Sequence, residues 1–178
     1  QERDPRSFFK AIRTLLDQGV SGADRLEVIL RATGDDDYFA AMVTEFGLDR
    51  VVRIEPSVPY KAALQEMMTA DGLLIFQDAS CNQQIPAKAY EYIRAQRPIL
   101  AMTDAAGDTA GVLREVGVDA IVPIDNANDI EKALRSFLEE RLGSPAPYNP
   151  ALVASYSRKG STAVLAGVLD SVLTEKGA

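Results

Sequence analysis

Apolar residues along this chain occur partly in short continuous runs and partly at helical spacing, which predicts alternating strands and helices. The runs that we expect to form strands are Leu26–Leu30, Val51–Ile54, Gly72–Phe76, Pro98–Met102 and Ala120–Pro123. The segments that we expect to form helices are residues 5–16, Tyr38–Phe46, Pro59–Ala70, a helix between Pro86 and Pro98, Thr109–Val116, Asp129–Glu140 and Ala163–Leu173. Strand starts separated by roughly 20–27 residues are typical of right-handed strand–helix–strand units. The pattern therefore predicts an α/β fold, a Rossmann-like parallel sheet with helices on both faces.

The same pattern divides the chain into two parts. Residues 1–142 carry the regular alternation and form the predicted Rossmann-like domain, and residues 143–178 form a Pro-rich linker and a C-terminal helix. That helix packs either on this domain or on another one. A doubly wound sheet usually opens with a strand, whereas this chain opens with a helix that Asp4 and Pro5 are expected to start. We therefore expect a strand, or a whole domain, to precede Gln1.

Composition narrows the function classes. A chain of 178 residues with 47% hydrophobic content can bury one core, and its net charge of −7 argues against a nucleic-acid surface. The absence of His removes Ser-His and Cys-His nucleophile pairs and most zinc or iron sites. A single Cys fits a reducing compartment, and no apolar run approaches the length of a membrane span. We expect a cytoplasmic location.

Charge lies at unusual positions around the helix that starts near Pro86. Lys88 falls in the first turn, where a cation opposes the helix dipole unless an anion binds above it. Glu91 follows on roughly the same face, and Asn82, Gln83 and Gln84 lie in the loop just before. In an open parallel sheet such loops at the carboxyl ends of strands hold ligands. The segment therefore suits a ligand with phosphates and hydroxyls, although an ordinary Lys88–Glu91 ion pair explains the two charges equally well.

Other polar positions have simpler interpretations. The loop from Gly107 to Thr109 offers backbone N–H groups and a hydroxyl at another helix start, with Asp108 between them. Cys81 is either a reactive thiol or a small buried residue, and burial is the more frequent state of a free Cys. The acidic run 35–37 lacks the spacing of a calcium loop and fits a helix start. Neither GxGxxG nor GxxxxGK[ST] occurs.

The segment PAKAYEYIRAQRPILA resembles the nucleotide-sugar motif of the group 1 (family 4) glycosyltransferases, which have the GT-B fold of two facing Rossmann-like domains. The family pattern has two Glu residues separated by seven others, then a basic residue, Pro and an apolar strand. Glu91 matches the second Glu and Arg97-Pro98 match the continuation, but Gln83 stands where the first Glu is expected. The weaker similarity of the remaining chain extends over about residues 1–173.

The resemblance implies roles for individual residues. Glu91 would bind the ribose of the nucleotide, and Gln83 would contact the donor sugar without the charge that the family has there. Lys88 and the preceding loop, with Asn82 and Gln84, would hold the diphosphate. Further donor-binding residues by similarity would be Arg3, Ser57, Tyr60, Asp108 and Thr109.

By this resemblance the chain would be the donor-binding, C-terminal half of a retaining, metal-independent glycosyltransferase that uses a nucleoside-diphosphate sugar as substrate and needs no cofactor. Its partners would be the missing N-terminal GT-B domain, through which it could lie at the inner membrane, and an acceptor glycan or lipid-linked glycan. Bacterial cell-surface glycan assembly is a common role of the family. The alternatives are a nucleotide-sugar 2-epimerase of the same fold, which the absence of His disfavours, and a non-catalytic GT-B-like binding or assembly domain, which Gln83 favours. A flavodoxin-like signalling domain would need an acidic phosphoacceptor cluster at the strand ends, and no strand supplies one.

Overall fold

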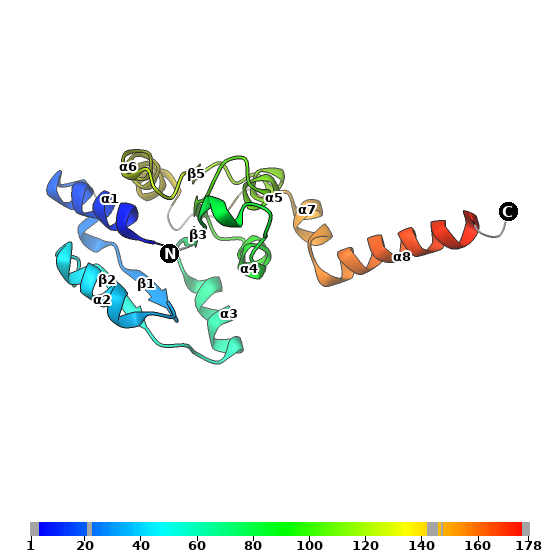
Figure 1. The fold of residues 1–178 in the computed structure, drawn as a ribbon, viewed down its shortest axis with the longest axis horizontal. Coiled ribbons are helices and arrows are strands. Elements are labelled where there is room, and N and C mark those ends of the chain that lie inside the picture. The colour runs from blue at the N-terminus through cyan, green and yellow to red at the C-terminus, as the bar shows by residue number, and fades with distance from the viewer. Residues whose placement is uncertain (1–3, 21–22, 142–145, 147, 176–178) are drawn as a thin grey trace.

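The computed structural model describes residues 4–20, 23–141, 146 and 148–175, which form an α/β structure (Figure 1). Its strands are β1 (Val28–Arg31), β2 (Val52–Glu55), β3 (Leu73–Phe76), β4 (Ile99–Met102) and β5 (Ile121–Val122). Its helices are α1 (Arg6–Asp17), α2 (Asp36–Glu45), α3 (Tyr60–Thr69), α4 (Ala87–Ala95), α5 (Asp108–Val116), α6 (Ala127–Ser136), α7 (Pro150–Ser155) and α8 (Arg158–Glu175). Each predicted strand overlaps an observed one, so the α/β alternation is confirmed.

The strands are all parallel, but they lie in two sheets instead of the single sheet that we predicted. β1 pairs with β2, with Val28 opposite Val52, and the second sheet has the order β3-β4-β5. In that second sheet Leu73 lies opposite Ile99 and Ala101 lies opposite Ile121. Among the described residues no strand pairing joins β1 to β3.

Helices cover both faces of the three-stranded sheet, as predicted. Along β4, Leu100 and Met102 belong to one apolar cluster, whereas Ile99 and Ala101 belong to another, because successive side chains of a strand point to opposite faces. The first cluster contains buried side chains of α1, α2 and α6, and the second contains side chains of α4 and α5. The three-stranded sheet is therefore enclosed between two helical layers, and the first residues after β3 and β4, Gln77 and Thr103, are buried as well.

Helix ends explain where the predicted boundaries shift. The carboxylate of Asp4 accepts a hydrogen bond from the Arg6 N–H, but the N-cap of α1 is Pro5, so the predicted cap at Asp4 is one residue too early. At α6 the predicted start at Asp129 is wrong. The Asn126 side chain accepts hydrogen bonds from the N–H groups of Asn128 and Asp129, so the helix begins two residues earlier. Its predicted final turn continues as a wider helical turn, η3 (Phe137–Arg141).

The C-terminal segment leaves the body of the domain (Figure 1). Residues 143–145 and 147 of the predicted linker lie outside the described residues, whereas Tyr148 is buried and its hydroxyl donates a hydrogen bond to the Arg97 carbonyl. Desolvation raises the pKa of Tyr148, so this phenol remains a donor at neutral pH. Helix α8 confirms the predicted final helix, and its apolar residues are exposed. Across the described part of the chain, no helix has both the length and the apolar character needed to cross a membrane.

Candidate functional site

The starts of α3 and α4 lie at the carboxyl ends of the strands that precede them. Pro59 and Pro86 are the N-cap residues of these two helices, and both have extended backbone angles. Proline fits here because a helix start needs no N–H from that residue. In both helices a lysine, Lys61 or Lys88, is the second helical residue.

A side-chain contact connects the two helices. The hydroxyl of Tyr60 donates a hydrogen bond of 3.2 Å to a carboxylate oxygen of Glu91. This contact brings together two residues that were assigned to nucleotide binding from separate parts of the sequence. Tyr60 remains 67% exposed, so its ring can still contact a ligand. The carboxylate of Glu91 keeps further acceptor positions, since each carboxylate can accept about four hydrogen bonds.

The alternative interpretation of Lys88 and Glu91 as an intrahelical ion pair does not hold in this structure. Among the described residues no ion pair joins the two side chains, and Glu91 is instead hydrogen-bonded to Tyr60. Lys88 is exposed in the first turn of α4. The helix has no acidic residue in that turn and no side-chain cap, so the partial positive charge of the helix end and the lysine charge add. An anion at this position would be stabilised by both.

The side chain of Gln77 holds the loop between β3 and α4 in place. This side chain is buried, and its amide group donates hydrogen bonds of 2.9 Å and 2.7 Å to the carbonyl groups of Cys81 and Gln84. The hydroxyl of buried Thr103, at the end of β4, donates to the Gln77 carbonyl oxygen. The sequence reasoning did not identify Gln77. Its signal was a polar residue directly after a continuous apolar strand.

The loop after β3 is also joined to the loop after β4. The Asn82 amide donates a hydrogen bond of 2.6 Å to the Asp104 carboxylate, and the Asp108 N–H donates one of 2.9 Å to the Asn82 carbonyl. Hydrogen bonds from the Ala106 N–H and the Asn82 side chain hold the pKa of Asp104 below its ordinary value. Asp104 is the second residue that the sequence reasoning missed. The two loops therefore form one hydrogen-bonded unit.

The side-chain oxygen of Asn82 is held in a tight space. A Cβ placed on Gly107 would lie 2.9 Å from this oxygen, so only glycine leaves room for it. The oxygen is buried and has no hydrogen-bond partner among the described residues. A buried amide oxygen without a donor is costly, which makes this atom a position where a ligand or a water molecule would be stabilised.

The predicted residues at the start of α5 are already occupied by contacts within the protein. The buried hydroxyl of Thr109 donates to the Gln84 carbonyl at 3.1 Å, and the Asp108 N–H is bound to Asn82. The Gly107 N–H donates to the Asp104 carbonyl. Thr109 and Gly107 thus hold the loop in place. Asp108 is exposed, and its role toward a ligand stays a prediction.

The remaining predicted residues are spread around this centre. Gln83 and Gln84 are exposed in the loop that leads to α4, and Ser57 is exposed in the loop between β2 and α3. Arg3 lies outside the described residues. Cys81 is partly exposed instead of buried, and its sulfur lies 3.9 Å from the Ser80 hydroxyl oxygen.

The acidic run 35–37 starts α2, as expected, with Asp36 and Asp37 in the first turn. In the described ranges no group of three or more acidic or Cys side chains is arranged to hold a metal ion. The candidate site consists of the amide side chains of the loop between β3 and α4, Lys88, Tyr60 and Glu91, with Asp104 holding the Asn82 side chain.

Comparisons of this chain with protein-family models, with curated proteins and with solved structures find no match.

Proposed function

We propose that this chain is the donor-binding half of a GT-B glycosyltransferase and binds a nucleoside-diphosphate sugar over the starts of α3 and α4. The observation that carries the proposal is the Tyr60–Glu91 hydrogen bond beside the uncapped, lysine-bearing end of α4. This arrangement offers an aromatic ring, a carboxylate and a positive helix end in one place. A base, a ribose and a diphosphate are recognised by these three groups.

Each group has a defined part in the proposed reaction. The Glu91 carboxylate accepts hydrogen bonds from ribose hydroxyls, and Lys88 and the α4 N–H groups bind the diphosphate. When the bond between the anomeric carbon and the phosphate oxygen breaks, its electron pair remains on the diphosphate. The added negative charge is stabilised by the same lysine and helix end. The acceptor hydroxyl forms the new glycosidic bond with the anomeric carbon and passes its proton to an oxygen of the departing diphosphate, in a site to which another domain contributes.

Isothermal titration calorimetry with UDP and GDP tests the site. We expect one nucleotide to bind, and Lys88→Ala and Glu91→Ala each to weaken its Kd by at least about tenfold, since a charged hydrogen bond contributes roughly 1.5–3 kcal/mol. Lys10→Ala is the matched control because Lys10 is an exposed lysine on α1. Equal affinity of the wild type and both site variants, or no binding at all, would refute the proposed site.

A non-catalytic binding domain of the same fold is the second candidate, and exposed, uncharged Gln83 favours it. Gln83→Glu discriminates between the two. In a transferase site the new carboxylate contacts the sugar, so a UDP-sugar should gain affinity relative to UDP. A domain without a sugar pocket should show the same ratio of the two affinities before and after the substitution.

A further inference from the structure

The two parallel sheets have facing edges without partners. Val28 and Ala32 donate backbone hydrogen bonds to β2, so the alternate residues Ile29 and Arg31 direct their N–H groups to the opposite side. In the same way Leu73 and Gln77 donate to β4. Leu74 and Phe76 therefore direct their N–H groups away from β4. The strand pairings among the described residues leave both of these edges open.

Helix α1 shows that the two sheets run in the same direction. The hydroxyl of Ser7 donates to the Asp125 carbonyl, three residues after β5, and the guanidinium of Arg6 donates to the hydroxyl of Tyr38, in the first turn of α2, the helix that follows β1. The start of α1 therefore lies near the carboxyl ends of strands from both sheets. β1 and β3 consequently run parallel to each other.

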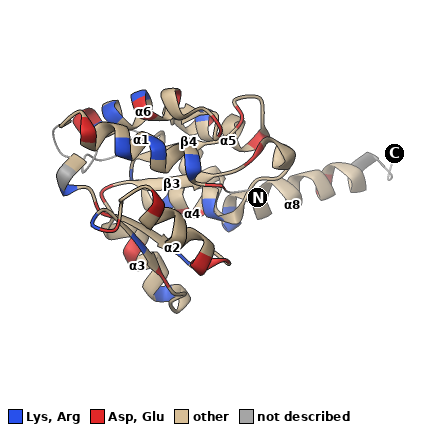
Figure 2. Cartoon of the chain, turned by 60° about the vertical axis from the view of Figure 1, so that its left-hand side comes forward, with Lys and Arg blue, Asp and Glu red and all other residues tan. Residues whose placement is uncertain are grey.

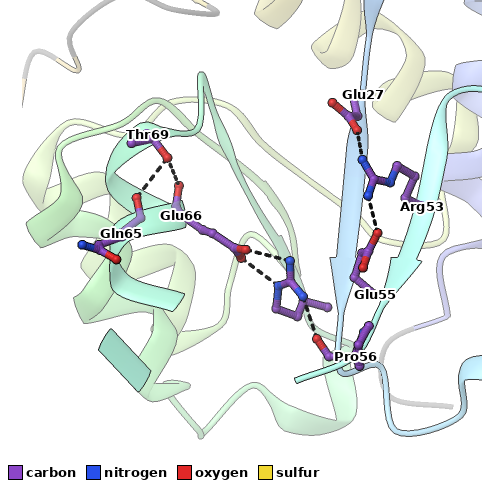
Figure 3. Close-up of polar contacts among 8 residues, drawn as sticks. Glu27, Arg53, Glu55, Pro56, Gln65, Glu66 and Thr69 are labelled. Carbon is purple, nitrogen blue, oxygen red and sulfur yellow. Dashed lines mark hydrogen bonds and ion pairs between the residues drawn. The ribbon is translucent and has the colours of Figure 1, made fainter. Parts of the chain in front are cut away.

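The sheets are also held by a common core. Val28 of β1 and Leu100 of β4 belong to one apolar cluster, to which Leu74 and Phe76 of β3 add partly buried side chains. The ring of Phe8 from α1 packs edge-to-face on Phe76, with 5.3 Å between ring centroids. On the opposite face Arg31 of β1 forms an ion pair with Glu66 of α3, the helix that leads to β3 (Figure 3).

We propose that the edges of β1 and β3 form a slot for one further β-strand, parallel to both and supplied by polypeptide joined to the N-terminal end of α1. With this strand the sheet order is β2-β1-strand-β3-β4-β5. That is the doubly wound order 3-2-1-4-5-6 with the inserted strand as its first member. The proposal rests on the open edges and the position of α1, and it does not depend on the proposed function.

Topology favours a strand on the same polypeptide over a separate one. A strand that ends at the carboxyl edge and continues into α1 and then β1 makes a parallel strand–helix–strand unit, which is right-handed in nearly all proteins. The inserted strand should be apolar on both faces, because Phe8 and Phe76 lie on one side and Ile29, which is 46% exposed, on the other.

Amide hydrogen exchange followed by NMR tests the slot. The 178-residue chain is compared with the same chain carrying an N-terminal extension of about six strand-forming Val, Ile and Thr residues. We expect exchange at the N–H groups of Ile29, Arg31, Leu74 and Phe76 to slow by at least about tenfold in the extended chain. The matched control extension carries Pro at alternate positions, which removes the ladder donors, and should leave these rates unchanged.

Three results would overturn the proposal. Unchanged exchange at the four amides in the extended chain would show that no strand docks. Protection of the amides in the monomeric, unextended chain would show that the sheets close without a further strand. Protection that grows with protein concentration, together with a dimer mass in light scattering, would assign the slot to a second copy. If the extended chain aggregates, a synthetic peptide with the sequence of the extension is added to the unextended chain instead. We expect it to protect the same four amides, and unchanged exchange would again show that no strand docks.

Discussion

The two sheets of this protein differ in how their faces are covered. Along β4 every residue is at most 2% exposed, because α1 and α6 contribute to the apolar cluster on one face and α4 and α5 to the cluster on the other. In the two-stranded sheet Val28 and Val52 are buried, whereas their neighbours Ile29 and Arg53 are exposed. The continuous apolar run of β4 therefore indicates a strand that is buried on both faces. The alternating pattern of β2 indicates a strand that is buried on one face.

Charged side chains occupy the open face of the two-stranded sheet. Arg53 lies between Glu27 at 2.6 Å and Glu55 at 2.5 Å (Figure 3). Figure 2 shows acidic and basic residues together on several helices of the body, whereas α8 carries few charges. Charged side chains on this face interact with water and discourage association with other chains. Their ion pairs contribute less to stability than buried apolar side chains do.

Loss of a core side chain from β4 should have the largest effect on stability. Leu100 is fully buried, so Leu100→Ala removes apolar contacts and leaves a cavity, which costs about 3 kcal/mol of unfolding free energy. Ile29→Ala on β1 is the matched substitution and should cost less than about 1 kcal/mol, because that side chain is 46% exposed. Urea unfolding measures both. Equal losses would mean that the open face of β1 is covered in solution.

A methyl group on Gly107 should have the next largest effect, and it acts on the loops of the three-stranded sheet. The new Cβ would meet the Asn82 side chain at 2.9 Å and displace it, so the Asn82–Asp104 hydrogen bond is lost. We expect Gly107→Ala to cost about 1–2 kcal/mol and to weaken nucleotide binding. Gly111→Ala is the control, since a Cβ there meets no atom within 4 Å. Similar stability of the two variants would contradict the tight contact.

Local sequence features predicted the elements because each strand is an apolar run bounded by Gly, Pro or charged residues, as Gly72–Phe76 illustrates. The division into two sheets could not be predicted, since pairing joins residues that are far apart in the chain. The partner of Glu91 illustrates the same limit. Helical spacing favoured Lys88 as the partner of Glu91, but the packing of α3 against α4 brings the Tyr60 hydroxyl within hydrogen-bond distance of Glu91 instead. Gln77 follows an apolar strand directly, but its role was missed because the sequence does not show which backbone carbonyls its amide group binds.

Loss of the contact between β1 and α3 should destabilise the protein less than Leu100→Ala or Gly107→Ala does. Arg31 binds both carboxylate oxygens of Glu66 at 2.7 Å and donates to the Pro56 carbonyl, but the Glu66 side chain is 48% exposed. Solvent screening limits the expected cost of Arg31→Ala to about 1 kcal/mol. Arg31→Lys keeps the charge without the paired geometry and should recover only part of this loss in urea unfolding. Full recovery by lysine would show that charge alone matters.

The smallest effect should come from Arg53, on the open face of the two-stranded sheet. Its two ion pairs are solvent-exposed, so Arg53→Ala should change the unfolding free energy less than Arg31→Ala does. Because salt screens exposed charges, this difference should shrink further in about 0.5 M NaCl. Unfolding of both proteins at low and high salt provides the measurement. A loss as large as that of Arg31→Ala that persists in salt would mean that the Arg53 pairs are buried. The contrast between a covered and an open sheet would then be wrong for this face.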